Sequence, residues 1–243
     1  ECQWLGLLDG GFNTNDKPYM IFGDASLNLA MPDSGFSIDE PAMFTSEQCD
    51  IGGTLNRDGL VMLTAWESAV PDSYYTHNSS YLIEYLSTPG VFYRGLADAS
   101  PDFAAEMFVP SFAVTGERGR VRYFSPGTGG GNLACSYPAL IEPGSTSGDD
   151  NGPDIELWLK GFRSIEHPSV SGNVIFEAAL EDSSGINLLP YPGAQLALYI
   201  DDTPVDVADY FTYELGSATQ GRIDYPLPEL QPGDHVLRLR ASD

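Results

Sequence analysis

Short runs in which apolar and polar residues alternate constrain this fold more than any other feature. The clearest runs lie in the C-terminal part of the chain: Asp154–Phe162, Asn173–Leu180, Gln195–Ile200, Gly221–Leu227 and Asp234–Arg240. In the first run, Ile155, Leu157 and Leu159 share one face, whereas Glu156 and Lys160 take the other. This period of two is typical of strands that bury one face. We therefore predict a β-sandwich over residues 152–243, with a structure made mainly of β-strands.

The preceding part of the chain carries similar strands at intervals of about ten residues, which favours a second sandwich over residues 42–143. The predicted strands are Asp50–Leu55, Leu60–Trp66, Tyr81–Leu86, Val91–Leu96, Phe103–Val109 and Gly119–Phe124. Asp58-Gly59 predicts a hairpin turn between the first two. Val61, Leu63 and Ala65 share one face of the second strand, and Val70–Ser80 is read as a loop.

Segments rich in Gly, Ser, Asp and Pro separate these modules. Residues 143–153, PGSTSGDDNGP, form the clearest boundary, and Pro32–Pro41 is read as an earlier linker. Before that linker, Tyr19–Phe22 is an apolar run closed by Gly23-Asp24, which indicates a buried strand and a turn. The residues before it are too few to surround such a strand. We therefore expect residues 1–32 to be the end of a larger domain.

The charge of the chain excludes two classes of partner. Its 35 acidic and 11 basic residues give a net charge of -24. A field of this sign repels nucleic acid and anionic membranes, and no apolar run approaches the length of a transmembrane helix. Adaptation to high salt, calcium binding and a well-solvated surface all remain open as reasons for the acidity.

Two ordered blocks resemble a known family. The block IFGDASLNLAMP is similar to the closing strand and turn of gingipain-type cysteine peptidase domains, which have a caspase-like α/β fold. Ala25 and Asn28 stand where that family usually has Pro and Arg. The second block comprises GPDIELWL, ALEDSSGIN, DYFTYELG and GRIDYPLPELQPGDHVLRLRASD, in that order. It resembles the C-terminal region of PorU-like proteins, the type IX secretion sortases of the same family.

The resemblance implies two tandem immunoglobulin-like β-sandwich modules after the terminal strand of an α/β caspase-like peptidase domain. The divisions are 1–32, 42–143 and 152–243. Because the resembling proteins continue with another strand, we expect the last module to be truncated at its C-terminus. The implied function is the non-catalytic C-terminal portion of a secreted or bacterial outer-surface cysteine peptidase. It would brace the missing upstream peptidase domain and present protein substrates or secretion-system proteins.

The family's chemistry uses a Cys thiolate and a His, but no position in this chain matches either residue. We therefore predict no catalytic residue and an inactive chain, although the parent protein would be an enzyme. Cys135 and His77 show no spacing that supports a nucleophilic pair. Cys49 and Cys135 could form a disulfide across one sandwich, or each could be a small buried residue. The alternative function is a non-enzymatic surface adhesin or structural β-sandwich module.

Acidic clusters are the remaining candidate sites. Asp149, Asp150 and Asp154 lie at the module boundary, where they could hold calcium or simply be solvated in a linker. No other cofactor is predicted. A second cluster comprises Asp201, Asp202, Asp206 and Asp209. We interpret these acids as residues that favour turns rather than as a binding site. In EDSSGIN, Asp182 is expected to cap the backbone of a tight turn. We interpret His235, near the last strand, as structural.

Overall fold

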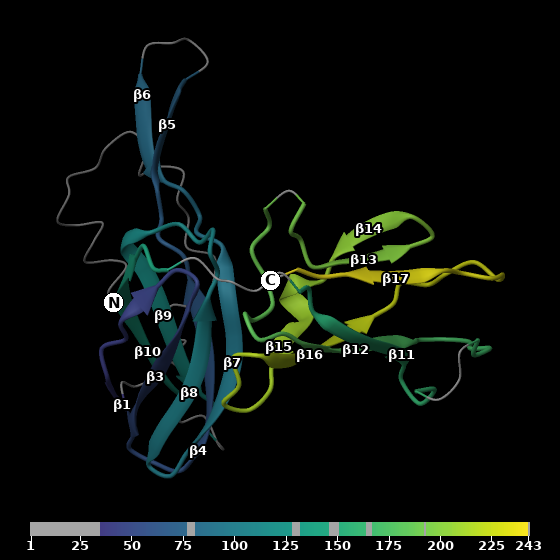
Figure 1. Cartoon of the computed structure of the whole chain (residues 1–243), viewed down its shortest axis with the longest axis horizontal. Helices are drawn as coiled ribbons and strands as arrows, with labels where there is room; N and C mark the ends of the chain where they lie inside the picture. The colour runs from purple at the N-terminus through teal and green to yellow at the C-terminus, as the bar shows by residue number, and fades with distance from the viewer. Residues whose placement is uncertain are drawn as a thin grey trace, which may run out of the picture. The chain divides into compact units, whose positions relative to one another are not determined.

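Strands dominate this protein and form five sheets in the described part of the computed structural model (Figure 1). The structure describes residues 35–76, 81–127, 132–145, 151–163, 167–191 and 193–242, all within the unit Pro32–Asp243. A 3-10 helix, η1 (Ala208–Tyr210), interrupts the strands. None of these residues forms a helix long and apolar enough to cross a membrane.

The first pair of sheets is built from residues 36–142. One sheet has the order β1-β3-β8, with bounds Phe36–Ile38, Glu47–Leu55 and Asp102–Val109. The other has the order β2-β10-β9-β4-β7, with bounds Met43–Phe44, Leu133–Glu142, Gly116–Ser125, Gly59–Trp66 and Val91–Ala99. The rings of Phe103 on β8 and Tyr123 on β9 meet at 5.8 Å between the sheets. The two sheets therefore pack face to face around a shared core, as in a β-sandwich.

The second pair of sheets follows residue 153. The larger sheet has the order β11-β12-β16-β15, with bounds Asp154–Leu159, Ile175–Glu181, Gln220–Pro226 and Phe211–Tyr213. The smaller has the order β14-β13-β17, with bounds Thr203–Asp206, Ala197–Ile200 and Leu237–Arg240. Phe176, Phe211 and Ile223 of the larger sheet and Leu198 of the smaller are fully buried in one hydrophobic cluster.

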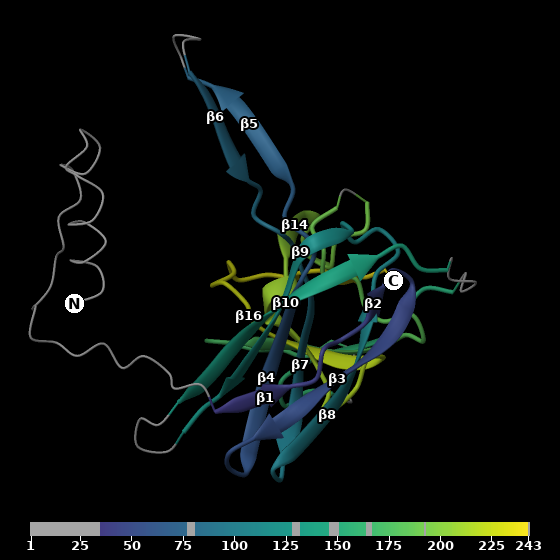
Figure 2. The ribbon, with the colours of Figure 1, turned by 90° about the vertical axis from the view of Figure 1, so that its left-hand side faces the viewer.

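The fifth sheet is a two-stranded antiparallel hairpin inserted between β4 and β7. Its strands are β5 (Pro71–Tyr75) and β6 (Leu82–Leu86), and every residue in both is exposed. Figures 1 and 2 show the hairpin projecting from the end of the first pair of sheets. An isolated hairpin gains little from burial, so its exposed apolar side chains need another explanation.

Several predicted faces are confirmed. Val61, Leu63 and Ala65 of β4 are buried, as the alternation indicates. The first run of the second module is different, because Leu157, predicted to point inward, is 47% exposed. It lies on β11, an edge strand of its sheet, and no strand of the described residues pairs with the outer flank of β11.

The predicted hairpin turn at Asp58-Gly59 is wrong. The strands on either side of this connection, β3 and β4, belong to different sheets and do not pair. Arg57 donates a hydrogen bond from Nη2 to the Ser125 carbonyl at 2.8 Å, which ties the connection to the end of β9. The chain thus uses a short polar turn to cross between the two facing sheets.

Six strands escaped prediction, namely the ten-residue β10 and the five short strands β1, β2, β5, β14 and β15. The linker Pro32–Pro41 contains β1, the loop Val70–Ser80 contains β5, and β14 and β15 lie in the acidic region after residue 200. The short strands have two to five residues, too few to display a clear alternation. These segments become strands because they pair with neighbouring strands in their sheets.

Some predictions lie outside the described residues. They are the peptidase strand within 1–32, His77, and the two boundary acids Asp149 and Asp150. The predicted module divisions and C-terminal truncation stay predictions. In the described chain, β17 is an edge strand paired with β13.

Candidate functional site

Two stacked tyrosines lie where the two pairs of sheets meet. Tyr93 on β7 and Tyr213 on β15 have ring centroids 4.8 Å apart and nearly parallel planes, and both are buried. The Tyr93 hydroxyl donates to the Ser217 carbonyl at 3.1 Å. The Tyr213 hydroxyl accepts from the Ile186 N–H at 2.7 Å and donates to the Ile186 carbonyl at 3.0 Å. Burial raises the pKa of both tyrosines, so they remain neutral donors.

A buried carboxylate joins the same region. Glu67, just after β4, is 7% exposed and accepts three hydrogen bonds. Its Oε1 accepts from the Gly90 N–H at 3.0 Å, and its Oε2 accepts from the Val114 N–H at 3.0 Å and the Tyr191 hydroxyl at 2.9 Å. Burial and the bond to Glu67 raise the pKa of Tyr191 to about 12. These donors compensate a charge that would be costly to bury alone.

A third set of contacts completes this region, which we call the junction. Arg94 on β7 donates to the Ala208 carbonyl at 2.7 Å and pairs with the Asp209 carboxylate at 2.5 Å. The Gly216 N–H donates to the Leu96 carbonyl of β7 at 2.8 Å. The junction thus comprises Glu67, Tyr93, Arg94, Tyr191, Asp209, Tyr213 and Gly216. Its stacked, charged and backbone contacts all join residues of the first pair of sheets to residues of the second.

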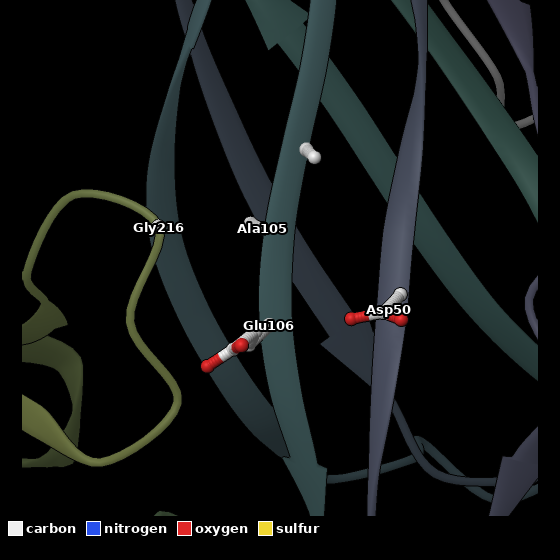
Figure 3. Close-up of a pocket in the computed structure, with 5 residues that line it drawn as sticks. Asp50, Ala105, Glu106 and Gly216 are labelled. Carbon is white, nitrogen blue, oxygen red and sulfur yellow. The ribbon is translucent and has the colours of Figure 1, made fainter.

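A small acidic pocket lies beside the junction (Figure 3). Its volume is about 370 Å³, and it is lined by Asp50, Ala104, Ala105, Glu106 and Gly216. Asp50 on β3 and Glu106 on β8 face each other across the strand ladder, so their carboxylates share one side of the sheet. Neither forms an ion pair with a described residue. Two carboxylates supply only part of the six to eight oxygens that calcium takes.

The hairpin presents the largest group of exposed apolar side chains in the described chain. This group, the hairpin surface, has exposed fractions between 39% and 74% and comprises Tyr74, Tyr75, Tyr81, Leu82, Ile83, Tyr85 and Leu86. The rings of Tyr74 and Tyr85 meet at 5.9 Å on one face. Tyr85 donates a hydrogen bond to Asp72 at 2.6 Å, which lowers the pKa of that carboxyl. Contiguous exposed apolar residues of this kind mark interaction surfaces.

The predicted calcium ligands are only partly visible. Asp154 is exposed at the start of β11, and its predicted companions Asp149 and Asp150 lie outside the described residues. Among the residues that the structure describes, no three His, Cys, Asp or Glu side chains gather as a metal site. The calcium site therefore stays a prediction.

The two described cysteines are free thiols on different sheets. Cys49 on β3 is buried, and this burial raises the pKa of its thiol to about 12. Cys135 on β10 is partly exposed and lies opposite Tyr123 in the strand ladder. A thiol with a raised pKa is a poor nucleophile, so the Cys49 environment is that of a core residue.

The turn interpretation is confirmed for Asp182, Asp201 and Asp202, whereas Asp206 ends β14 and Asp209 lies in η1, where it pairs with Arg94. Asp201 and Asp202 form the two-residue connection between β13 and β14, with φ values of 48° and 70°. Positive φ at both positions is typical of a type I′ turn. In the other turn, Asp182 accepts hydrogen bonds at 2.8 Å from the backbone N–H and the hydroxyl of Ser184.

His235 also proves to be a structural link. Its Nδ1 lies 2.5 Å from an Asp201 carboxylate oxygen, and its Nε2 lies 2.7 Å from the Gln231 carbonyl. The Asp201 carboxylate also accepts from the Val236 N–H at 2.8 Å. The link therefore ties the β13–β14 turn to the approach to β17.

Sequence reasoning missed the junction and the hairpin surface. Glu67 looks like an ordinary acid in the run TAWESAV, and no local pattern shows that Tyr191 will reach it. The hairpin did carry a signal, because Tyr74, Tyr75, Tyr81 and Tyr85 cluster within a few residues of one another. A loop with so many aromatic residues is unusual and favours either burial or binding.

The described fold is therefore built mainly of β-sheets, with contacts at the junction between the two pairs of sheets and an exposed aromatic hairpin. No protein-family model matches the chain, and no curated protein matches it.

Proposed function

We propose that this chain is the non-catalytic C-terminal portion of a secreted or surface cysteine peptidase of the gingipain type, most like the PorU-like sortases. Its modules, immunoglobulin-like by this resemblance, would brace the peptidase domain and present substrates or partner proteins to it. The observation that carries the proposal is the ordered pair of sequence blocks, IFGDASLNLAMP and the residues after Gly152. The first would be the terminal strand of the caspase-like domain.

The junction supports the bracing role. To hold a peptidase domain in place, the two pairs of sheets would need contacts that limit their movement relative to each other. Tyr93 and Tyr213 stack without solvent between them, and Arg94 and Gly216 add polar contacts across the same boundary. Interfaces that combine buried aromatic area with satisfied hydrogen bonds resist relative motion better than small polar ones do.

The coding sequence upstream of Glu1 tests the parent family directly. We expect a few hundred residues of α/β pattern with a His and a Cys at successive strand ends. The protein that includes them should cleave an unfolded protein substrate in the presence of a thiol reductant, and iodoacetamide should abolish the cleavage. The 243-residue chain assayed alone should show no cleavage. Thiol-dependent hydrolysis by the chain itself would contradict the proposal.

The second candidate, a surface adhesin or structural module, is favoured by the hairpin surface. An adhesin needs an exposed binding element, and Tyr74, Tyr75 and Tyr85 supply exposed aromatic area. Upstream β-repeats in place of an α/β pattern would establish this alternative.

A further inference from the structure

We propose that the outer edge of β6 binds an extended segment of another protein by strand addition. The partner segment would carry a Lys or Arg between two apolar residues at alternate positions. This inference goes beyond the proposed function and rests on the hairpin alone. It therefore holds or fails whatever lies upstream of Glu1.

The hydrogen-bond register shows which backbone groups of the hairpin are open. Thr76 N–H donates to the Tyr81 carbonyl, and Ser87 N–H donates to the Val70 carbonyl. In an antiparallel ladder, bonded and non-bonded pairs alternate, so Ser73 and Glu84 form a non-bonded pair whose N–H and C=O groups point outward. The same alternation turns the backbone groups of Leu82 and Leu86 outward on β6.

The two edges of the hairpin are not equivalent. On β5, Pro71 has no N–H, and the Ser73 N–H already donates to the Asp72 carboxylate at 2.7 Å. Proline and a nearby charge are devices that block edge pairing in natural sheets. On β6, the outward positions are Leu82, Glu84 and Leu86, and no described strand other than β5 pairs with β6. The open edge is therefore the β6 edge.

Side chains beside this edge define the partner. Leu82, Glu84 and Leu86 occupy alternate positions and so share one face of the sheet. Glu84 lies between these two exposed leucines. It is itself exposed and forms no ion pair within the described chain. An added strand places its own alternate side chains beside these three. An apolar residue, a cation and an apolar residue complement them in that order.

Charge also decides between another protein and a second copy of this chain. Two copies would each bring a net charge of -24. The segment from Val70 to Ser87 contains the acidic residues Asp72 and Glu84 but no Lys or Arg that could form an ion pair with them in a second copy. A cationic segment of another protein meets complementary charge at this edge, and long-range attraction would speed its approach.

A fluorescein-labelled peptide, Thr-Val-Thr-Lys-Thr-Val-Thr, is the probe, and fluorescence anisotropy with the whole chain is the readout. Its charge-reversed version has Glu in place of Lys. We expect the Lys peptide to bind about tenfold more tightly at low salt, with the difference shrinking at 1 M NaCl. Equal binding of the two peptides would overturn the proposal, because it would show non-selective adhesion to apolar surface.

Matched proline variants at one cross-strand pair test the edge itself. Glu84→Pro removes an outward N–H from β6, whereas Ser73→Pro removes its counterpart from β5, and neither N–H serves the hairpin's own ladder. Because Glu84→Pro also removes the carboxylate, its reference is Glu84→Gln. We expect Glu84→Pro to bind the Lys peptide about tenfold more weakly than Glu84→Gln does, and Ser73→Pro to bind it within about twofold of the native chain. Equal losses in the two variants would contradict the assigned edge.

Two further measurements guard the interpretation. The first is binding to Glu84→Lys, a variant that keeps every backbone group of β6. It should bind the Glu peptide more tightly than the Lys peptide. If it still prefers the Lys peptide, Glu84 does not select the partner's charge. Sedimentation of the chain without peptide tests the second copy as occupant. We expect monomers, whereas self-association abolished by Glu84→Pro would assign the edge to a copy of the chain and overturn the proposal.

Discussion

The tyrosines of the junction and those of the hairpin have opposite environments. Tyr93 and Tyr213 are 0% and 2% exposed, whereas Tyr75 and Tyr85 are 67% and 44% exposed. All four lie on strands, so secondary structure does not separate them. What differs is the presence of a facing layer: β7 and β15 meet at the junction, whereas β5 and β6 form a sheet of only two strands. The same residue type therefore stabilises the fold in one place and is left available for binding in the other.

Truncating one tyrosine from each region gives the largest expected contrast. Tyr213→Ala should lower the free energy of unfolding by about 4 kcal/mol, because it removes a buried ring and both bonds to Ile186. Tyr85→Ala should change it by less than about 0.5 kcal/mol, since the side chain is on the surface. Urea unfolding followed by fluorescence measures both. Similar losses in the two variants would show that the hairpin is part of the cooperative core.

The buried carboxylate gives the next contrast. Glu67→Ala leaves the N–H groups of Gly90 and Val114 and the Tyr191 hydroxyl without their acceptor, and should cost about 3 kcal/mol. Tyr191→Phe removes one donor only and should cost about 1 kcal/mol. Glu84→Ala in the hairpin is the exposed control and should be nearly neutral in the same urea titration. A neutral Glu67→Ala would mean that water replaces the carboxylate.

The His235 link should make stability depend on pH. The Gln231 carbonyl and the Asp201 carboxylate raise the pKa of His235, with Asp234 adding to the effect. A raised pKa gives a contribution that is complete below the unfolded value of about 6.5 and lost as pH rises through the folded value. The Val236 N–H and His235 lower the pKa of Asp201, so its contribution is lost only in acid, as pH falls through that lowered value.

Thermal melts from pH 4 to 9 measure this dependence. The difference in Tm between the native chain and His235→Gln should be greatest near pH 5 to 6 and should vanish at the alkaline end. His167→Gln, at an exposed histidine, is the matched control substitution. A difference for His235→Gln that is constant across the range would rule out the charged link.

The smallest effect is expected in the acidic pocket. Like charges directly opposite each other on neighbouring strands are destabilising, so Asp50→Asn should raise stability by about 0.3 kcal/mol. That corresponds to about 1 °C in Tm, and the gain should disappear at high salt. Asp98→Asn, an exposed acid on β7, is the comparison. A lower Tm for Asp50→Asn would indicate that a bound cation uses the carboxylate.

The alternation of residues determined much of this fold without any structure. The buried positions of β4 and the strands β12, β13 and β16 follow from side chains that point to opposite faces at each step. The turns at Asp182 and Asp201 were predictable for a similar reason, since a short acidic side chain bonds to the backbone beside it. These are local effects, carried by neighbours in the chain.

The tertiary structure decided what depends on distant neighbours. It separated β3 from β4, placed Leu157 on an exposed edge and brought Tyr191 to Glu67 across more than a hundred residues. No local pattern encodes such a contact, because the burial of a side chain and the pairing of a strand depend on which distant segments of the chain pack against them. The same holds for the hairpin: the sequence placed its tyrosines close together, and they are exposed because no sheet among the described residues faces β5 and β6.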